Sequence, residues 1–507
     1  MPFNSIFAWM IKKRIHQIDL FRKYPLDVQN ELFTNLIRTA ANTEWGMKYQ
    51  FSAIQNQKDF QKSVPLQEYE DIKPYVDRAI HGELNVLWPG ETKWFAKSSG
   101  TTSDRSKYIP VTKESLEDCH YKGGKDLLSV YYDNYATANL YSGKHLVVGG
   151  STQLNDAAGS DSYFGDLSAI IVKNLPWWAE IKRTPSKEIA LMSDWEPKIE
   201  LMAQETIHQD VCIITGVPSW TLVLAHRILE ITGKNNLKEV WPNLELFMHG
   251  GVNFEPYRAE FNKIIPSEGM HYVESYNASE GIFGMQDQPD SDELLLLLDY
   301  GIFYEFIPMD AFEGTQSKRV LTLTEVELDT NYALVISTNG GLWRYIIGDT
   351  IKFTNLKPFR FKITGRTKSF INAFGEELIV ENAEKAITKT CQELGAQVRD
   401  YTAGPLYMQF LEDAHKGRHE WIIEFINEPA DLAEFAAVLD QHLRAINSDY
   451  DAKRSHDIAL LGPLIRKAAS GTFDAWLKSK GKLGGQHKVP RLSNNRDIID
   501  ELNVFLD

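Results

Sequence analysis

The sequence predicts an α/β protein: a large N-terminal α/β domain that contains a β-barrel-like subdomain, followed by a small C-terminal α+β domain. Its 507 residues are too many for one compact core. From about residue 91, short apolar runs alternate with helix-length segments, the pattern of buried strands covered by helices. Around residue 366 the pattern changes to a shorter mixture of helices and strands. We therefore expect an N-terminal domain over residues 1–365 and a C-terminal domain over residues 366–507.

The first 90 residues read as helices separated by polar loops, with breaks expected at Pro65 and Pro74. At the very start, a short apolar run precedes the charges, which is the wrong order for a signal peptide. We expect an amphipathic helix there that docks on the body of the protein. A helix lying on a membrane surface is the alternative.

Apolar runs of β type define the expected strands of the N-terminal domain. The first group covers residues 145–148, 211–214, 244–248 and 271–273, with a helix expected at 220–231. A second group, at 294–306, 319–326, 332–337 and 342–353, comes in quick succession, which favours antiparallel pairing or a small barrel. In the C-terminal domain we expect helices at 377–394 and 430–446 and strands at 405–411 and 421–425.

The charge balance excludes some classes of partner. The chain has 54 Lys and Arg against 69 Asp and Glu, a net charge of −15, so its overall field attracts neither nucleic acid nor an anionic membrane. The longest apolar stretch outside the N-terminus, residues 294–298, is too short for a transmembrane segment. The three cysteines are far apart, which argues against disulfides or a cysteine zinc site and favours a reducing, cytoplasmic location.

The loop SSGTTS at residues 98–103, followed by Lys107, has the composition of a phosphate-binding loop. Small residues let a loop approach a phosphate closely, and N–H and O–H groups together with the Lys107 ammonium are donors. The order differs from the P-loop pattern G-x-x-x-x-G-K-[ST], which we do not find. An ordinary Ser/Thr/Gly loop is the alternative.

A second motif, SYNASEG at residues 275–281, follows an apolar strand, the place where α/β proteins hold ligands. Tyr276 is suited to stacking on a purine. Glu280 is suited to holding Mg²⁺, which prefers carboxylate oxygens together with phosphate. The alternative is a polar turn with an exposed glutamate.

A third motif joins WRYIIGD at residues 343–349 with the pair Gly365-Arg366. Asp349 at a strand end is suited to accepting hydrogen bonds from both ribose hydroxyls, and Arg366 to donating to ribose or phosphate. A hairpin turn in which Asp349 satisfies its own backbone is the alternative.

Two further segments complete the set. GGQHKVPR at 484–491 is a mobile glycine loop from which Lys488 could stabilise developing negative charge, or else a solvated basic loop. TGVPSW at 215–220 begins a helix after a strand and is a candidate wall of an acyl pocket, formed by Val217, Ser219 and Trp220. Aromatic residues there suit a flat or aryl acid, but a packed core explains them equally well.

The chain resembles the adenylate-forming superfamily of acyl-CoA synthetases, firefly luciferase and peptide-synthetase adenylation domains. The resemblance rests on the motifs in this order: SSGTT with KYIP, SYNASEG, WRYIIGD, TGRTK and GGQHKVPR. Within this superfamily, the sequence is most similar to the Gretchen Hagen auxin-responsive acyl acid–amido synthetases. The features that point to this family within the superfamily are residues 95–102 with 107–111, YEFIP at 304–308, and GTF at 471–473 ahead of 486–491. The resemblance runs from about residue 60 to 495.

The resemblance implies a ligase that uses ATP and Mg²⁺ to activate a small-molecule carboxylic acid as an acyl-adenylate and passes the acyl group to an amine, such as an amino acid. It implies an N-terminal adenylation domain that binds the acid and ATP, and a mobile C-terminal lid that rotates between the two half-reactions. Lys488 and Glu280 would be catalytic, Glu280 as the Mg²⁺ ligand. ATP and AMP would be bound by Ser98, Ser99, Gly100, Thr101, Thr102, Ser103, Lys107, Gly250, Gly251, Tyr276, Asp349 and Arg366.

Two alternatives stay open. An acyl-CoA ligase shares the first step and uses coenzyme A as the acceptor. A non-catalytic nucleotide-binding protein on the same fold is disfavoured by the presence together of Glu280, Asp349, Arg366 and Lys488. The sequence departs from the wider superfamily at the hinge after Gly365-Arg366, where Lys368 or Ser369 stands in place of the usual Asp or Lys.

Overall fold

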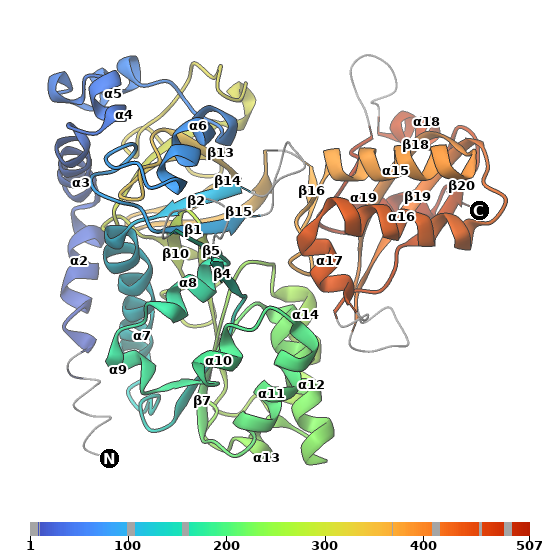
Figure 1. Cartoon of the computed structure of the whole chain (residues 1–507), viewed down its shortest axis with the longest axis horizontal. Coiled ribbons are helices and arrows are strands. Elements are labelled where there is room, and N and C mark those ends of the chain that lie inside the picture. The colour runs from blue at the N-terminus through green and yellow to red at the C-terminus, as the bar shows by residue number, and fades with distance from the viewer. Residues whose placement is uncertain are drawn as a thin grey trace.

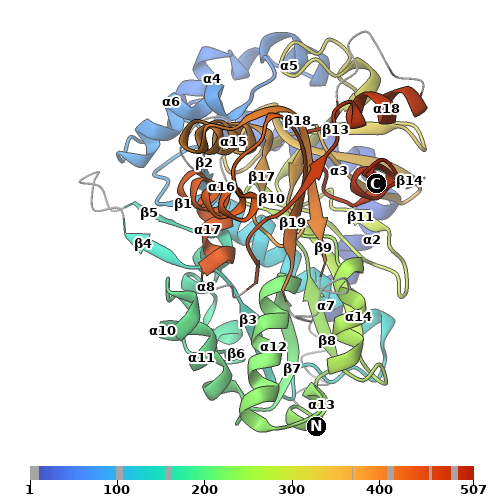
Figure 2. The same ribbon diagram turned by 90° about the vertical axis from the view of Figure 1, so that its right-hand side faces the viewer.

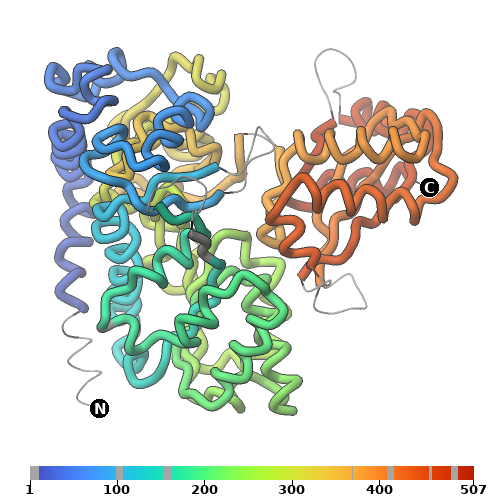
Figure 3. Tube along the Cα trace, in the orientation of Figure 1, coloured from blue at the N-terminus to red at the C-terminus, as the bar shows by residue number. Residues whose placement is uncertain are grey.

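The computed structural model describes residues 9, 11–98, 107–154, 162–367, 369–407, 416–455, 459–480 and 489–506. We call the described residues up to 367 the N-terminal body and those from 369 onward the C-terminal module. The module stands beside the body in Figure 1 and in Figure 3. This arrangement of a large and a small α/β part agrees with the fold class predicted from the sequence.

The body begins with helices. In Figure 1, α2 (Ile15–Lys23) and α3 (Pro25–Ala40) run along one flank, and α4 (Glu44–Lys48), α5 (Gln57–Ser63) and α6 (Tyr69–Ile80) lie at its upper end. Helix α6 runs through Pro74, where the sequence predicted a break; Ile72 and Val76 on either side are fully buried and fix the helix by tertiary packing.

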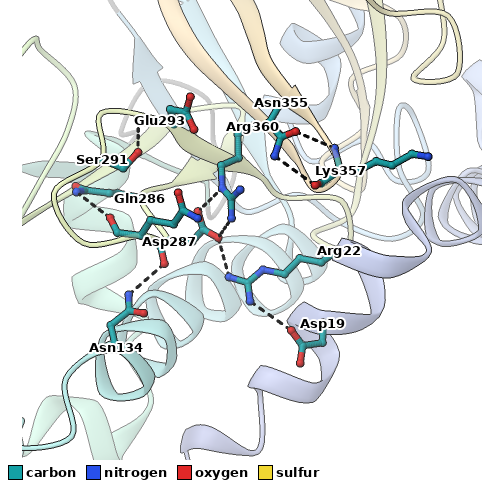
Figure 4. Close-up of polar contacts among 11 residues, drawn as sticks. Asp19, Arg22, Asn134, Gln286, Asp287, Ser291, Glu293, Asn355, Lys357 and Arg360 are labelled. Atoms are coloured by element: carbon teal, nitrogen blue, oxygen red, sulfur yellow. Dashed lines mark hydrogen bonds and ion pairs between the residues drawn. The ribbon is translucent and has the colours of Figure 1, made fainter. Parts of the chain in front are cut away.

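The predicted N-terminal helix docks on the body through two arginines. Arg14 pairs with the buried carboxylate of Asp126 at 2.7 Å. Arg22 donates to Asp287 at 2.8 Å, and Arg360 from strand β15 (Phe359–Arg366) donates to the same carboxylate at 2.9 Å, so Asp287 holds a helix and a strand together (Figure 4). Helix α2 is thereby joined to the main sheet by a buried charge network.

An eleven-stranded sheet forms the centre of the body. Its order is β12-β13-β14-β15-β11-β10-β9-β8-β7-β3-β6, parallel from β9 to β6 and antiparallel elsewhere. The strands are β3 (Lys144–Val148), β6 (Arg183–Thr184), β7 (Val211–Gly216), β8 (Leu246–His249), β9 (His271–Ala278), β10 (Gly281–Met285), β11 (Leu294–Leu296), β12 (Ile302–Pro308), β13 (Asn331–Thr338), β14 (Tyr345–Leu356) and β15 (Phe359–Arg366).

Further helices and a smaller sheet cover this centre. The helices are α7 (Lys122–Asn134), α8 (Leu167–Lys173), α9 (Trp177–Glu180), α10 (Lys187–Ala190), α11 (Trp195–Thr206), α12 (Pro218–Thr232), α13 (Leu237–Val240) and α14 (Glu255–Ile264). The smaller sheet has the order β2-β1-β5-β4, with β1 (Trp94–Ser98), β2 (Lys107–Val111), β4 (Thr152–Leu154) and β5 (Tyr163–Gly165).

The second group of predicted strands is antiparallel, as expected, with two differences. Among the described residues, β12 to β15 continue the main sheet, whose outermost strands are β12 and β6, and do not close on themselves as a separate barrel. The strand predicted at 319–326 is wrong: only Leu321 pairs, with Phe306, through two 2.8 Å hydrogen bonds. The Thr322 amide donates to the Glu325 carboxylate at 2.9 Å, and this turn ends the pairing.

The C-terminal module packs helices on a three-stranded sheet of order β18-β19-β20, which faces the viewer in Figure 2. Its elements are β16 (Phe370–Ile371), β17 (Leu378–Ile379), α15 (Val380–Leu394), β18 (Gln397–Leu406), β19 (Arg418–Asn427), α16 (Leu432–Ile446), α17 (Ser448–Arg454), β20 (Leu464–Ala468), α18 (Thr472–Ser479) and α19 (Asp497–Asn503). None of the helices in the described part of the chain is long and apolar enough to cross a membrane.

Candidate active site

The parallel strands β3, β7 and β8 end in register at one edge of the main sheet, and β9 runs past them to Ala278. Gly216 of β7 lies beside His249 of β8, and His249 lies beside Glu274 of β9. Several predicted site segments therefore follow directly from neighbouring strand ends: Val217 after β7, Gly250 and Gly251 after β8, and the end of the SYNASEG motif after β9. This is the edge where open α/β sheets bind ligands.

Gly250 and Gly251 are glycines for two different reasons. A Cβ on Gly250 would lie 2.3 Å from the Ser275 carbonyl oxygen, so only glycine lets the loop pass this close to β9. Gly251 has a φ of +82°, a conformation that side chains disfavour. At these two positions the backbone reaches the strand edge without side chains, as close contact with a flat ligand requires.

Tyr276 lies within β9, because this strand runs on to Ala278 and not only over residues 271–273, where the sequence predicted it. The ring is buried, with its centroid 4.9 Å from that of Phe283. Its hydroxyl donates to the Asp349 carboxylate at 2.5 Å. Burial, and then the negative charge of Asp349, raise the pKa of Tyr276 well above its ordinary value, so the hydroxyl keeps its proton.

Asp349 and Arg366 are direct cross-strand partners on β14 and β15. The Arg366 Nε lies 3.0 Å from the Asp349 Oδ1, and a second guanidinium nitrogen is paired with Glu377 of the C-terminal module. Although burial opposes its charge, the carboxylates of Glu377 and Asp349 raise the pKa of Arg366 above its ordinary value. The third predicted motif is thus assembled as a charged, partly buried pair, and Glu377 joins it.

Glu280 occupies the turn between β9 and β10. Burial raises the pKa of its carboxyl group to about 7, and the positive charge of Lys107 opposes this rise. In the described part of the chain no three His, Cys, Asp or Glu side chains gather in a ready-made metal site. A single carboxylate fits Mg²⁺ that is shared with phosphate oxygens and water, since Mg²⁺ often takes only one or two protein carboxylates.

Ser98 and Lys107 are paired at the open ends of β1 and β2. The other residues of the predicted phosphate loop, Ser99, Gly100, Thr101, Thr102 and Ser103, lie outside the described residues, as does Lys488. Lys107 lines a pocket together with Gly348, Arg366 and Thr367, and Glu68, Glu70 and Glu381 line it too. The structure therefore brings Lys107 and Arg366, far apart in the sequence, to one cavity.

The candidate acyl wall meets the C-terminal module. Ser219 donates to the Phe374 carbonyl oxygen at 3.0 Å. Trp220 is 3% exposed and stacks on Trp195, with ring centroids 3.9 Å apart and planes inclined by 5°. A Cβ on Gly251 would lie 3.6 Å from Val217, so this wall and the glycine pair are neighbours.

Sequence reasoning missed three participants. Glu377 was read only as part of a helix, although its pairing with Arg366 places it at the site. Gly348 has a φ of +96°, and a Cβ on this residue would lie only 3.3 Å from the Arg366 guanidinium, so glycine leaves room for Arg366. Lys453 of α17 lies over the face of Trp220, 4.3 Å from the ring centroid, and no local pattern pointed to it.

Comparison with known proteins agrees with this architecture. Sequence models of the GH3 family N-terminal, central and C-terminal domains match residues 14–270, 295–366 and 381–497. The chain is 24% identical to the 4-substituted benzoates-glutamate ligase GH3.12 of Arabidopsis thaliana, over 94% of each chain.

Solved structures share the fold. The acyl acid amido synthetase AtGH3.15, in complex with 2,4-DB, superimposes with a TM-score of 0.63 at 18% identity, covering 98% of this chain and 96% of the other. A 2-hydroxyisobutyryl-CoA ligase superimposes with a TM-score of 0.56 at 12% identity, covering 96% and 93%. With three consecutive domain matches that span most of its length, the chain belongs to the GH3 family.

Proposed function

We propose that this protein is an ATP-dependent acyl acid amido synthetase that activates a carboxylic acid as its acyl-adenylate and transfers the acyl group to an amine, most naturally an amino acid. The observation that carries the proposal is the assembly of Tyr276, Asp349 and Arg366 with Glu280 and Lys107 nearby. A scaffold protein needs no such set of charged groups at the ligand-binding edge of its sheet. The ligase names of its relatives support the same conclusion.

The chemistry requires two displacements. A carboxylate oxygen attacks the α-phosphorus of ATP, the bond to the β-phosphate oxygen breaks, and pyrophosphate leaves. The amine nitrogen then attacks the acyl carbon of the mixed anhydride, AMP leaves with the electron pair of the broken C–O bond, and the nitrogen loses a proton. Both steps bring negatively charged or electron-rich groups together, so positioning and electrostatic stabilisation are the main tasks of the protein.

We assign the nucleotide to the edge described above. Ser98 to Ser103 and Lys107 would hold phosphates, Gly250 and Gly251 would lie along the adenine, and Tyr276 would pack against it. Asp349 would accept hydrogen bonds from the ribose hydroxyls while Arg366 and Tyr276 fix its orientation. Mg²⁺, when bound, would neutralise phosphate charge, with Glu280 as its protein ligand.

Other parts of the proposal rest on the sequence. Lys488 would bridge the carboxylate and the α-phosphate during adenylation. Val217, Ser219 and Trp220 would form a wall of the acyl pocket. We propose residues 1–365 as the adenylation domain and 366–507 as a lid that moves between the half-reactions. We also propose a cytoplasmic location, because the cysteines that the structure describes are unpaired thiols.

An acyl-CoA ligase is the second candidate, because a CoA ligase shares the fold over nearly the whole chain. One experiment separates the two. Purified protein is incubated with ATP, Mg²⁺ and a panel of acids, and each mixture receives either the twenty amino acids or coenzyme A. Mass spectrometry of an N-acyl amino acid, with AMP released in equal amount, supports the amide-forming proposal. An acyl-CoA product in its place would overturn it.

A further inference from the structure

Two buried lysines flank the stacked pair of Trp195 and Trp220. Lys198 of α11 lies over Trp195, with its Nζ 4.6 Å from the ring centroid, and Lys453 of α17 lies over Trp220 at 4.3 Å. Lys198 is fully buried and Lys453 is 8% exposed. The tryptophan rings are only 3.9 Å apart, so neither ammonium fits between them, and the lysines occupy the outer sides of the pair.

The two lysines differ in their hydrogen-bond partners. The Lys198 ammonium donates to three carbonyl oxygens, those of Gly149, Gly150 and Met192, at 2.6, 2.9 and 3.3 Å. Within the described ranges, no oxygen accepts a hydrogen bond from the Lys453 ammonium. The face of Trp220 attracts its charge but offers no acceptor for its three N–H groups. Lys198 is therefore satisfied as a structural residue, whereas Lys453 has no anionic or carbonyl partner in the part of the chain that the structure describes.

The Lys453 side chain is 8% exposed, and its Nζ is not one of the enclosed polar atoms that lack a partner in the described residues, so solvent reaches the ammonium. A ligand that enters from solvent would meet a positive charge that no described protein oxygen accepts from. Burial lowers the pKa of Lys453 to about 8, which still leaves it charged at neutral pH. The carboxylates of Asp449, Glu376 and Asp166 favour the charge from a distance, but none of them is within ion-pair distance. An anionic group that enters here would gain a charge-assisted hydrogen bond from a largely buried side chain.

Lys453 also lies beside the proposed reaction site. A Cβ on Gly375 would be 3.2 Å from the Lys453 Nζ and 3.9 Å from Val217, and Val217 in turn neighbours Gly251 of the proposed nucleotide site. Because Lys453 belongs to the C-terminal module and Trp220 to the body, the ammonium is placed where the two parts meet.

We propose that Lys453 binds the carboxylate of the acceptor amino acid and so makes the enzyme select amino acids over simple amines. This inference rests on the proposed function, since it identifies the acceptor class of the same site. It predicts that the acceptor site is completed by the module and the body together, with the Trp195–Trp220 pair as its floor.

The test compares each accepted amino acid with its carboxamide, which keeps the amine and loses the charge. Wild type should prefer the amino acid by about tenfold or more in kcat/KM, the size expected for a charge-assisted hydrogen bond. Lys453→Met should lower that preference to about twofold, mainly through the KM of the amino acid, and Lys453→Arg should restore much of it. Lys467→Met, at an exposed lysine paired with Glu428, is the matched control and should keep the wild-type preference.

ATP–pyrophosphate exchange by Lys453→Met should stay near the wild-type rate, because adenylation precedes acceptor binding. If Lys453→Met keeps the full preference for amino acids, or wild type shows none, the inference is overturned. If no acid supports exchange in wild type, the proposed function has failed. A thermal-shift assay then tests separately whether Lys453 binds a carboxylate. Amino acids, but not their carboxamides, should raise the Tm of wild type and of Lys467→Met but not of Lys453→Met. If amino acids fail to raise the Tm of wild type, the proposed carboxylate site is overturned.

Discussion

Arg366 holds the Asp349 carboxylate at 3.0 Å while its other end is paired with Glu377, so one guanidinium links the proposed ribose site to the C-terminal module. Asp349 also accepts a hydrogen bond from Tyr276, which leaves its remaining lone pairs for a ligand. Any movement of the module that separates Glu377 from Arg366 therefore alters the charge next to the proposed nucleotide site. Arg366 is thus shared by the proposed nucleotide site and the contact with the module.

Replacement of Asp349 by asparagine should weaken both ATP binding and the fold. The partly buried Arg366 would lose one of its two carboxylate partners, at a cost of about 2 kcal/mol in the free energy of unfolding. The KM for ATP in pyrophosphate exchange should rise by about tenfold or more. Asp292→Asn is the control: Asp292 forms an exposed pair with Lys362, and its loss should cost less than about 0.5 kcal/mol. An unchanged KM for ATP in Asp349→Asn would remove the ribose assignment.

Glu280→Gln should raise the Mg²⁺ concentration needed for half-maximal exchange, because an amide is a weaker Mg²⁺ ligand than a carboxylate. Glu274→Gln is a suitable control, since Glu274 lies on β9, the strand that leads into the turn with Glu280, and burial raises the pKa of its carboxyl group to about 7 as well. The two variants should differ in a Mg²⁺ titration of exchange activity. Identical titrations for Glu280→Gln and wild type would exclude Glu280 as the metal ligand.

Lys488→Ala should lower pyrophosphate exchange by about a hundredfold or more, the loss expected when a charged group that stabilises the transition state is removed. ATP affinity, measured by calorimetry, should change little, because the proposed role arises only when the carboxylate attacks. Lys480→Ala, which breaks an exposed pair with Glu501, should keep normal exchange. Normal pyrophosphate release by Lys488→Ala would rule out the proposed role of this lysine.

The pH dependence of acceptor binding should report Lys453. Burial lowers its pKa to about 8, so the ammonium that attracts a carboxylate is present below pH 8 and is lost above it. The KM for the amino acid should therefore rise above pH 8 in wild type and stay flat in Lys453→Met. Loss of a proton from the acceptor amine affects both proteins alike. The ratio of the KM of wild type to the KM of Lys453→Met at each pH therefore isolates the titration of Lys453. The same slope in both proteins would contradict the assignment.

Local patterns in the sequence predicted much of this site. Asp349 and Arg366 were each recognised from a glycine and a strand end, and the structure makes them direct partners. Their register could not be predicted, because two bulges shift the pairing of β14 and β15. The strand that carries Tyr276 was expected only at 271–273, since nothing in the motif shows that β9 continues to Ala278.

What the sequence could not predict depends on contacts between distant segments. Lys453 sits in SDYDAKR, a helix that reads as polar and exposed, and contacts with distant residues such as Trp220 and Gly375 bury it. Glu377 likewise became a site residue only through the position of the C-terminal module. The strand predicted at 319–326 failed because a side-chain-capped turn at Thr322 outweighed its β-type composition.

ATP–pyrophosphate exchange by the purified protein, with aryl, fatty and indole-type carboxylic acids, tests the central claim most directly. Exchange with one class of acid, dependent on Mg²⁺ and reduced in Asp349→Asn, is the predicted result and identifies the first substrate. Measurable ATP binding without exchange for any acid would contradict acid activation and favour a non-catalytic nucleotide-binding protein on this fold.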